Sequence, residues 1–224
     1  MSVAASSVGD RKALAGAFVE VLSYPYSTPA LAAWRCADAA RGESSDAASL
    51  LEAFASLVEA TEQGTLQEEY TRAFDLDTMS RSEPTCYPYV GHYLFDESHK
   101  RGAFILGLRK RFRAAGFEDD SDLSDHLVVL LRFLAVSDDE ELVDELVDDA
   151  ILPALARMAI AAGPTPAGAP ATLRDAYLGV VRALALSLGA GRPERAVDPL
   201  TAETEREWAR SGDSLGISRD WCGH

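Results

Sequence analysis

The chain has 224 residues, 47% of them hydrophobic and 25% charged, which is typical of a globular protein and excludes a disordered one. Its formal net charge of -15 argues against nucleic-acid binding, because that binding depends on lysine and arginine side chains that replace the counterions of phosphates. A basic partner therefore suits the chain better than nucleic acid or an anionic membrane.

Three amphipathic helices are predicted in the first part of the chain. They span residues 10–23, 29–42 and 44–64. Asp10 is a good N-cap for the first helix, and Pro29 suits the first turn of the second, which Gly42 should end. The loop between these two helices reads SYPYSTP and loses the helical spacing of apolar residues.

A fourth helix is predicted from a capping box. The hydroxyl of Thr65 can cap one free amide, and the carboxylate of Glu68 can reach back to another. Tyr70 and Phe74 then lie along one face of this helix. Residues 75–88, DLDTMSRSEPTCYP, contain turn formers and prolines without any periodicity, which indicates a loop of functional length.

Three further helices follow this loop. The first two cover residues 89–98 and 100–116, with Gly116 as the expected C-cap. The third should be capped by Asp122 or Ser124. Its core-facing stripe consists of Leu127, Leu130, Leu131 and Leu134.

Two long apolar patterns come last. The stretch 137–163 opens with acidic residues that complement a helix N-terminus, and Pro153 should kink it. A proline-rich connector, residues 163–170, leads to a final helix over residues 173–188. This connector would allow two chains to exchange their last helices, so a monomer and a domain-swapped dimer both remain open.

The predicted fold class is all-α, because no segment shows the alternating pattern of a strand. We expect a single-domain helical bundle of about eight to ten helices over residues 10–190. Residues 191–224 have the composition of a loosely ordered C-terminal tail.

A cytoplasmic location is expected from three features. The N-terminus lacks a charged segment followed by a long apolar run, and no stretch reaches the length of a membrane span, so stable membrane insertion is not expected. The three cysteines, Cys36, Cys86 and Cys222, are far apart in sequence, which is typical of a reducing compartment.

One alternative is a small helical metalloenzyme. His92, Asp96 and His99 are spaced so that one helix face could present all three to a metal, and Cys86 or His126 could complete the set. The competing interpretation is an exposed helix with two ordinary histidines, which we favour because zinc sites usually show closer Cys and His pairing. Metal analysis of the purified protein separates the two.

The charged residues fall into two runs of opposite sign. Residues 118–149 contain thirteen acids and one base, whereas residues 100–113 contain six bases and no acid. Such runs are commonly solvated helix faces. They could equally attract a basic partner segment and speed its association with the chain.

Several short motifs in residues 66–135 follow a recognisable order. Tyr70 and Phe74 in EEYTRAF come first, then EPTCYPY, KRG at 100–102, DLSDHL and RFLA. This order resembles the TorD/NarJ family of cytoplasmic chaperones, which mature molybdenum-containing redox enzymes. The loop sequence PTCYPYVGHYLFDES is closer to the NarJ-like branch of nitrate reductases and related respiratory dehydrogenases.

The resemblance implies an all-helical chaperone that has no catalytic activity and no cofactor of its own. Family members bind the N-terminal region of a molybdoenzyme catalytic subunit, often a twin-arginine signal, and hold that subunit until its cofactor is inserted. Carried onto this chain, the resemblance implies a peptide groove lined by Asp125 and His126, with Tyr70, Phe74, Tyr87 and Tyr89 nearby.

One departure from the family pattern affects this groove. The family often carries an acid in the helix after D-H-L, where this chain reads VVLLRF with Leu130, Leu131 and Arg132. A polar contact made by other members is therefore expected to be missing. A general helical interaction module without a redox client is the remaining alternative, and capture of a molybdoenzyme subunit would exclude it.

Overall fold

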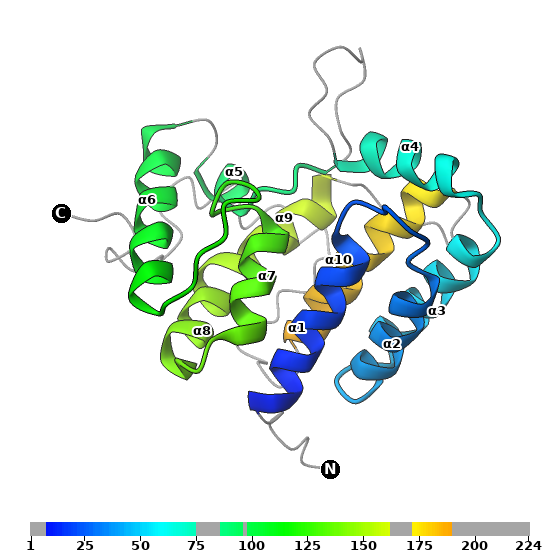
Figure 1. The fold of residues 1–224 in the computed structure, drawn as a ribbon, viewed down its shortest axis with the longest axis horizontal. Coiled ribbons are helices and arrows are strands. Elements are labelled where there is room, and N and C mark those ends of the chain that lie inside the picture. The colour runs from blue at the N-terminus through cyan, green and yellow to red at the C-terminus, as the bar shows by residue number, and fades with distance from the viewer. Residues whose placement is uncertain (1–7, 75–85, 96–97, 162–171, 190–224) are drawn as a thin grey trace.

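A computed structural model describes residues 8–74, 86–95, 98–161 and 172–189, and within these ranges the chain is an α-helical bundle, as predicted (Figure 1). The helices are α1 (Val8–Leu22), α2 (Ala30–Arg41), α3 (Ser45–Glu59), α4 (Gln63–Phe74), α5 (Val90–Phe95), α6 (His99–Ala114), α7 (Leu127–Val136), α8 (Glu140–Leu146), α9 (Leu152–Ala161) and α10 (Leu173–Gly189). None of these helices combines the length and apolar character that a membrane span requires.

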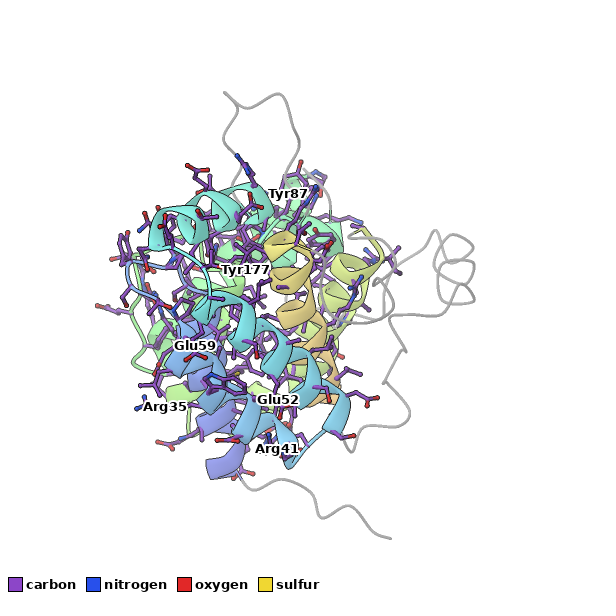
Figure 2. All side chains as sticks on the ribbon, turned by 90° about the vertical axis from the view of Figure 1, so that its right-hand side faces the viewer. Arg35, Arg41, Glu52, Glu59, Tyr87 and Tyr177 are labelled. Carbon is purple, nitrogen blue, oxygen red and sulfur yellow. The ribbon has the colours of Figure 1, made fainter. Side chains whose placement is uncertain are left out.

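Helix α10 lies at the centre of the bundle. It packs against α3, α4 and α9, and α1 beside it packs against α7 and α2 (Figure 1). Tyr177 of α10 is fully buried, and its ring meets those of Phe54, Tyr70 and Phe74 at centroid distances of 5.0 to 5.6 Å. Figure 2 shows Tyr177 within the bundle, whereas Arg41 and Glu52 form an ion pair at its surface.

Two helix ends have well-defined caps, and the cap after α6 is the predicted one. Ser44 caps α3 by accepting a hydrogen bond from the backbone N–H of Ala47 at 3.2 Å. Gly116 follows α6 with a φ of 72°, a left-handed conformation that suits glycine. The N–H groups of Gly116 and Phe117 bond to the carbonyls of Arg113 and Phe112, which is the Schellman arrangement.

The predicted start of α4 is wrong. The helix begins at Gln63, and the N–H of Leu66 already bonds to the carbonyl of Glu62 at 3.0 Å. Thr65 is therefore the third residue of the helix and cannot be its N-cap. Helix α3 also ends at Glu59, earlier than expected, because the chain turns sharply to bring α4 onto α10.

Pro153 has a structural effect close to the expected kink. A single π-helical turn, Val147–Ile151, separates α8 from α9, and the N–H of Leu152 bonds to the carbonyl of Val147 five residues earlier. A proline cannot donate a backbone hydrogen bond, and its ring crowds the carbonyl four residues before it. A π turn is one way in which a helix accommodates such a disturbance and continues.

Candidate functional site

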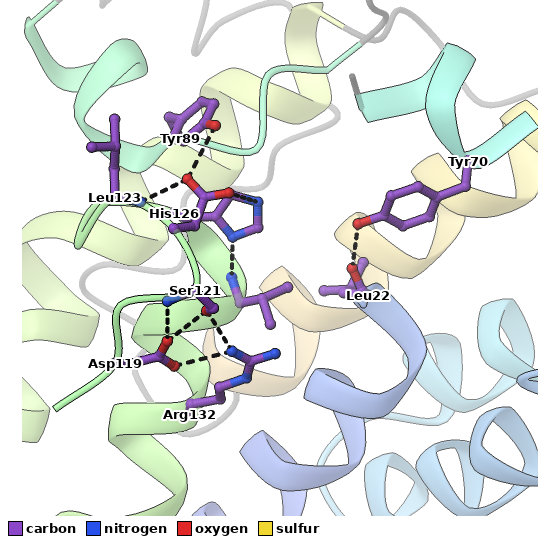
Figure 3. A network of polar contacts seen from close by, with 10 residues as sticks. Leu22, Tyr70, Tyr89, Asp119, Ser121, Leu123, His126 and Arg132 are labelled. Carbon is purple, nitrogen blue, oxygen red and sulfur yellow. Dashed lines mark hydrogen bonds and ion pairs between the residues drawn. The ribbon is translucent and has the colours of Figure 1, made fainter. Parts of the chain in front are cut away.

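A groove of about 530 Å³ opens between the end of α1, α4, the segment before α5 and the start of α7. Four of the predicted site residues line it, namely Tyr70, Phe74, Tyr89 and His126. One wall is aromatic and the other is polar. Figure 3 shows Tyr70 on one side and Tyr89, His126 and Arg132 on the other.

Tyr70 is the centre of the aromatic wall. Its hydroxyl donates a hydrogen bond to the carbonyl of Leu22 at 2.8 Å, which ties α4 to the end of α1 (Figure 3). Its ring meets Phe74 at 5.1 Å on the same helix and Tyr24 at 5.5 Å on the loop after α1. Edge contacts of this kind stabilise aromatic pairs beyond the area that they bury.

Two groove residues, Tyr24 and Tyr26, were missed by the sequence analysis. Their rings contact each other at 4.9 Å, and their exposed fractions are 38% and 86%. The signal for them was present, because two tyrosines flank Pro25 just as Tyr87 and Tyr89 flank a proline in the later loop. Their position opposite α7 depends on long-range packing that the sequence does not reveal.

The polar wall is built on an isolated β-bridge between Tyr89 and His126. The N–H of Val90 bonds to the carbonyl of Asp125 at 2.8 Å, and the N–H of Leu127 bonds to the carbonyl of Pro88 at 2.7 Å. These two bonds fix the aromatic loop against the beginning of α7. They bring the PYV and DHL motifs together, although the two motifs are far apart in sequence.

His126 is the N-cap of α7, a role that was predicted for Asp122 or Ser124. Its Nδ1 accepts a hydrogen bond from the N–H of Val128 at 3.2 Å. An imidazole that accepts at Nδ1 is neutral and carries its proton on Nε2, which faces Asp122 Oδ2 at 4.0 Å. Burial lowers the pKa of His126, although Asp122 and Asp125 act in the opposite direction.

Tyr89 is held on three sides. Its hydroxyl donates to Asp122 Oδ1 at 3.2 Å, its ring meets the edge of His126 at 5.2 Å, and the Arg101 guanidinium lies 5.1 Å from its ring centroid. Burial and the Asp122 carboxylate raise the pKa of Tyr89 to about 12. The phenol therefore stays protonated and remains a donor.

The positive charge of Arg132 is neutralised by a neighbouring acid. Its guanidinium bonds to Asp119 Oδ2 at 3.0 Å and to the hydroxyl of Ser121 at 2.7 Å (Figure 3). Burial alone would raise the pKa of Asp119, but hydrogen bonds from Ser121 and Arg132 outweigh it and lower the pKa. The VVLLRF segment, in which an acid of other family members was expected to be missing, thus carries the cation Arg132. The charge of Arg132 is neutralised by Asp119 of the same chain.

Asp125 and Tyr87 lie outside the lining of the groove. Asp125 is fully buried and accepts from Arg101 Nε at 2.9 Å, while its Oδ1 has no hydrogen-bond partner among the described residues. Burial raises the pKa of Asp125, and Arg101 opposes that change. The ring of Tyr87 instead packs on His92, with a centroid distance of 4.4 Å.

The alternative of a metal site with His92 and His99 on one helix face is contradicted by the structure. Helix α5 ends at Phe95, and His99 is the first residue of the next helix, α6. Asp96 lies outside the described residues. Among the residues that are described, no group of three His, Cys, Asp or Glu side chains is arranged to hold a metal ion.

Comparison with known families gives one match over residues 38–159, just over half of the chain. The matching family is described as the nitrate reductase delta subunit. This chain belongs to that family. Membership confirms the resemblance seen in the sequence and implies a chaperone of molybdoenzyme maturation, whose partner is a molybdoenzyme catalytic subunit. No curated protein matches the chain significantly.

The family match covers the polar wall and α4 but not the loop that carries Tyr24 and Tyr26. Within this delta-family chain, the basic and acidic runs pair with each other in part. Three ion pairs connect them, Arg101–Asp125 at 2.9 Å, Arg109–Asp120 at 3.7 Å and Arg111–Glu145 at 2.9 Å. Part of the acidic run therefore serves the fold.

Proposed function

We propose that the protein is a cytoplasmic chaperone whose groove binds the N-terminal or signal region of a molybdoenzyme catalytic subunit. It holds this subunit for cofactor insertion before export or assembly. Family membership supports the class of partner, and one observation supports the mode of binding. This observation is the groove of about 530 Å³ in which an exposed aromatic wall faces a wall with an accessible carboxylate.

The two walls match the two parts of a basic, apolar peptide. Tyr24, Tyr26 and Tyr70 offer aromatic surface to apolar side chains, and burying such surface drives association. Aromatic residues in a preformed groove lose little conformational freedom on binding. The opposite wall carries Asp122 and can attract a cationic side chain at the end of the same peptide.

The proposed mechanism needs no covalent step. The chaperone binds the immature subunit more tightly than the mature one, and this difference in affinity delays export or assembly. Cofactor insertion stabilises a conformation of the subunit that withdraws the peptide, and the chaperone is released. The chaperone acts stoichiometrically in this scheme.

The client is identified by capture from the native host. The tagged chain is purified, the associated proteins are identified by mass spectrometry, and a molybdoenzyme catalytic subunit is expected among them. Binding of a synthetic peptide with the N-terminal sequence of this subunit is then measured by calorimetry. The absence of any molybdoenzyme subunit would contradict the proposed partner.

The groove is tested with a variant that carries Tyr24→Ser and Tyr26→Ser. Both side chains are exposed, so the fold should persist while affinity for the peptide falls about tenfold or more, as for aromatic residues at interfaces. Leu31→Ser is the matched control, because Leu31 is 64% exposed and does not line the groove. Equal affinities of the two variants would exclude this groove as the binding site.

A further inference from the structure

Two acids, Asp122 in the polar wall and Asp125 behind it, differ in accessibility. The Asp125 side chain is fully buried, and its Oδ2 accepts from Arg101 Nε at 2.9 Å. Gly91 closes the space above it, since a Cβ atom at that position would lie 2.6 Å from the same Oδ2. A guanidinium from another chain could reach Asp125 only if this packing opened.

Asp122 is accessible by contrast. Its side chain is 36% exposed and lines the groove. Oδ1 accepts from the Tyr89 hydroxyl at 3.2 Å and from the N–H of Leu123 at 2.6 Å. Oδ2 faces His126 Nε2 at 4.0 Å, and no lysine or arginine of the described chain pairs with this carboxylate.

The charges around Asp122 leave it as the uncompensated group of the wall. Arg132 is neutralised by Asp119, to which it bonds at 3.0 Å. His126 is neutral because its Nδ1 accepts from a backbone N–H. The wall therefore presents one net negative charge to the groove.

We propose that Asp122 is the carboxylate that receives an arginine of the bound peptide, and that Asp125 is a positioning residue beneath it. This inference rests on the proposed function and specifies how the groove recognises its ligand. The connection between the two acids runs through Arg101 and Tyr89. Asp125 holds Arg101, Arg101 lies over the Tyr89 ring, and the Tyr89 hydroxyl fixes Asp122 Oδ1.

An arginine suits this position better than a lysine. Oδ2 of Asp122 stays available as an acceptor, and the rings of Tyr89 and His126 stand nearby, 5.2 Å apart between centroids. A planar guanidinium can hydrogen-bond the carboxylate and stack on an aromatic ring at the same time. An ammonium group can do only the first of these efficiently.

The test compares two synthetic peptides and four proteins. One peptide carries two adjacent arginines before a leucine- and alanine-rich run, and the other has citrulline, an uncharged analogue, in place of both arginines. The proteins are the full-length wild type and its D122N, D125N and D120N variants. D120N is the matched control, because Asp120 is two residues from Asp122, is exposed and does not line the groove.

Wild type and D120N should prefer the arginine peptide over the citrulline peptide by about fivefold, the upper range for an ion pair that keeps contact with water. D122N should lose this preference. D125N should lower the thermal unfolding temperature and weaken the binding of both peptides by a similar factor. If D125N fails to fold, the comparison of D122N with D120N still shows whether Asp122 receives the arginine.

An unchanged arginine preference in D122N would overturn the inference and leave the proposed function standing. Loss of the preference in D125N alone, with normal thermal stability, would also overturn it and assign the contact to Asp125. If wild type binds neither peptide, the proposed signal-binding function fails, and the inference fails with it.

Discussion

Gly91 in α5 lies against the buried ion pair of Asp125 and Arg101. A Cβ atom there would lie 2.6 Å from Asp125 Oδ2, 3.1 Å from Arg101 Cγ and 3.2 Å from Phe104 Cδ1. Gly91→Ala should therefore lower the free energy of unfolding by roughly 1 to 3 kcal/mol, the range for overpacking of a core. Urea denaturation followed by circular dichroism measures the change.

Gly102→Ala is the control for this substitution. Gly102 lies inside α6, and a Cβ atom at that position meets no other atom within 4 Å. Alanine favours a helix interior over glycine, so this variant should gain roughly 0.5 to 1 kcal/mol. Equal effects of the two substitutions would contradict the close packing assigned to Gly91.

His126 should make stability depend on pH through its role as N-cap. Protonation of Nδ1 removes the acceptor for the Val128 N–H, and burial lowers the pKa of His126 in the folded chain. The unfolded chain therefore takes up the proton first. The stability contributed by the neutral His126 cap is complete above about pH 6.5, the pKa of an unfolded histidine. This contribution is lost as the pH falls through the lower pKa of His126 in the folded state.

A His126→Asn variant isolates this effect. Asparagine can cap the helix without titrating, so urea midpoints of the variant should change less than those of wild type between about pH 6.5 and about pH 5. Asp125 acts in the opposite direction, because burial raises its pKa, but it is present in both proteins. Parallel pH curves for the two proteins would show that His126 does not cap α7 in solution.

At the scale of helices, removal of two tyrosine hydroxyls should change the stability of the protein in opposite directions. The Tyr177 hydroxyl in α10 is buried without a hydrogen-bond partner among the described residues, so Tyr177→Phe should be neutral or raise stability by about 1 kcal/mol. The Tyr70 hydroxyl bonds to Leu22 across α4 and α1, so Tyr70→Phe should lower stability by about 1 kcal/mol. Thermal unfolding by calorimetry distinguishes the signs.

The apolar spacing of the sequence was sufficient to place most helices. It predicted that Leu127, Leu130, Leu131 and Leu134 of α7 face the core, although Val128, Val129 and Phe133 are buried as well, so this helix is enclosed on nearly every side. It failed at the start of α4, where a good local cap at Thr65 is overridden by packing of the preceding turn. Local propensities are weaker than such tertiary contacts.

The candidate site was predictable only in part. The PYV and DHL motifs could be associated from sequence, and the β-bridge of Tyr89 and His126 now joins them. The burial of Asp125 could not be foreseen, because it depends on Arg101 and Gly91, which belong to other helices. Tyr24 reaches the groove through contact with Tyr70, a pairing that no local pattern encodes.

At the scale of the whole molecule, the net charge of -15 should speed association with a basic peptide. We expect the association rate constant of the two-arginine peptide to fall steeply between low and physiological salt, while its dissociation rate changes little. Stopped-flow fluorescence measures both rates. The citrulline peptide should show a much flatter dependence, and equal salt dependence of the two peptides would contradict electrostatic attraction of the arginines.

The extent of the folded unit can be tested by truncation. A chain that ends at Gly189 should keep the thermal unfolding temperature of the full chain, because α10 ends there. A chain that ends at Ala161 should not fold cooperatively, since it lacks a helix that is buried along nearly its whole length. If the chain that ends at Gly189 unfolds at a lower temperature than the full chain, the folded domain extends beyond residue 190.

The central place of α10 has a consequence during translation. This helix leaves the ribosome after all the other described helices, yet it supplies the surface on which α3, α4 and α9 pack. The earlier helices cannot complete their shared core until α10 has emerged, so the bundle closes late. Nascent chains that stall before α10 would expose this apolar surface and become substrates for general chaperones and proteases.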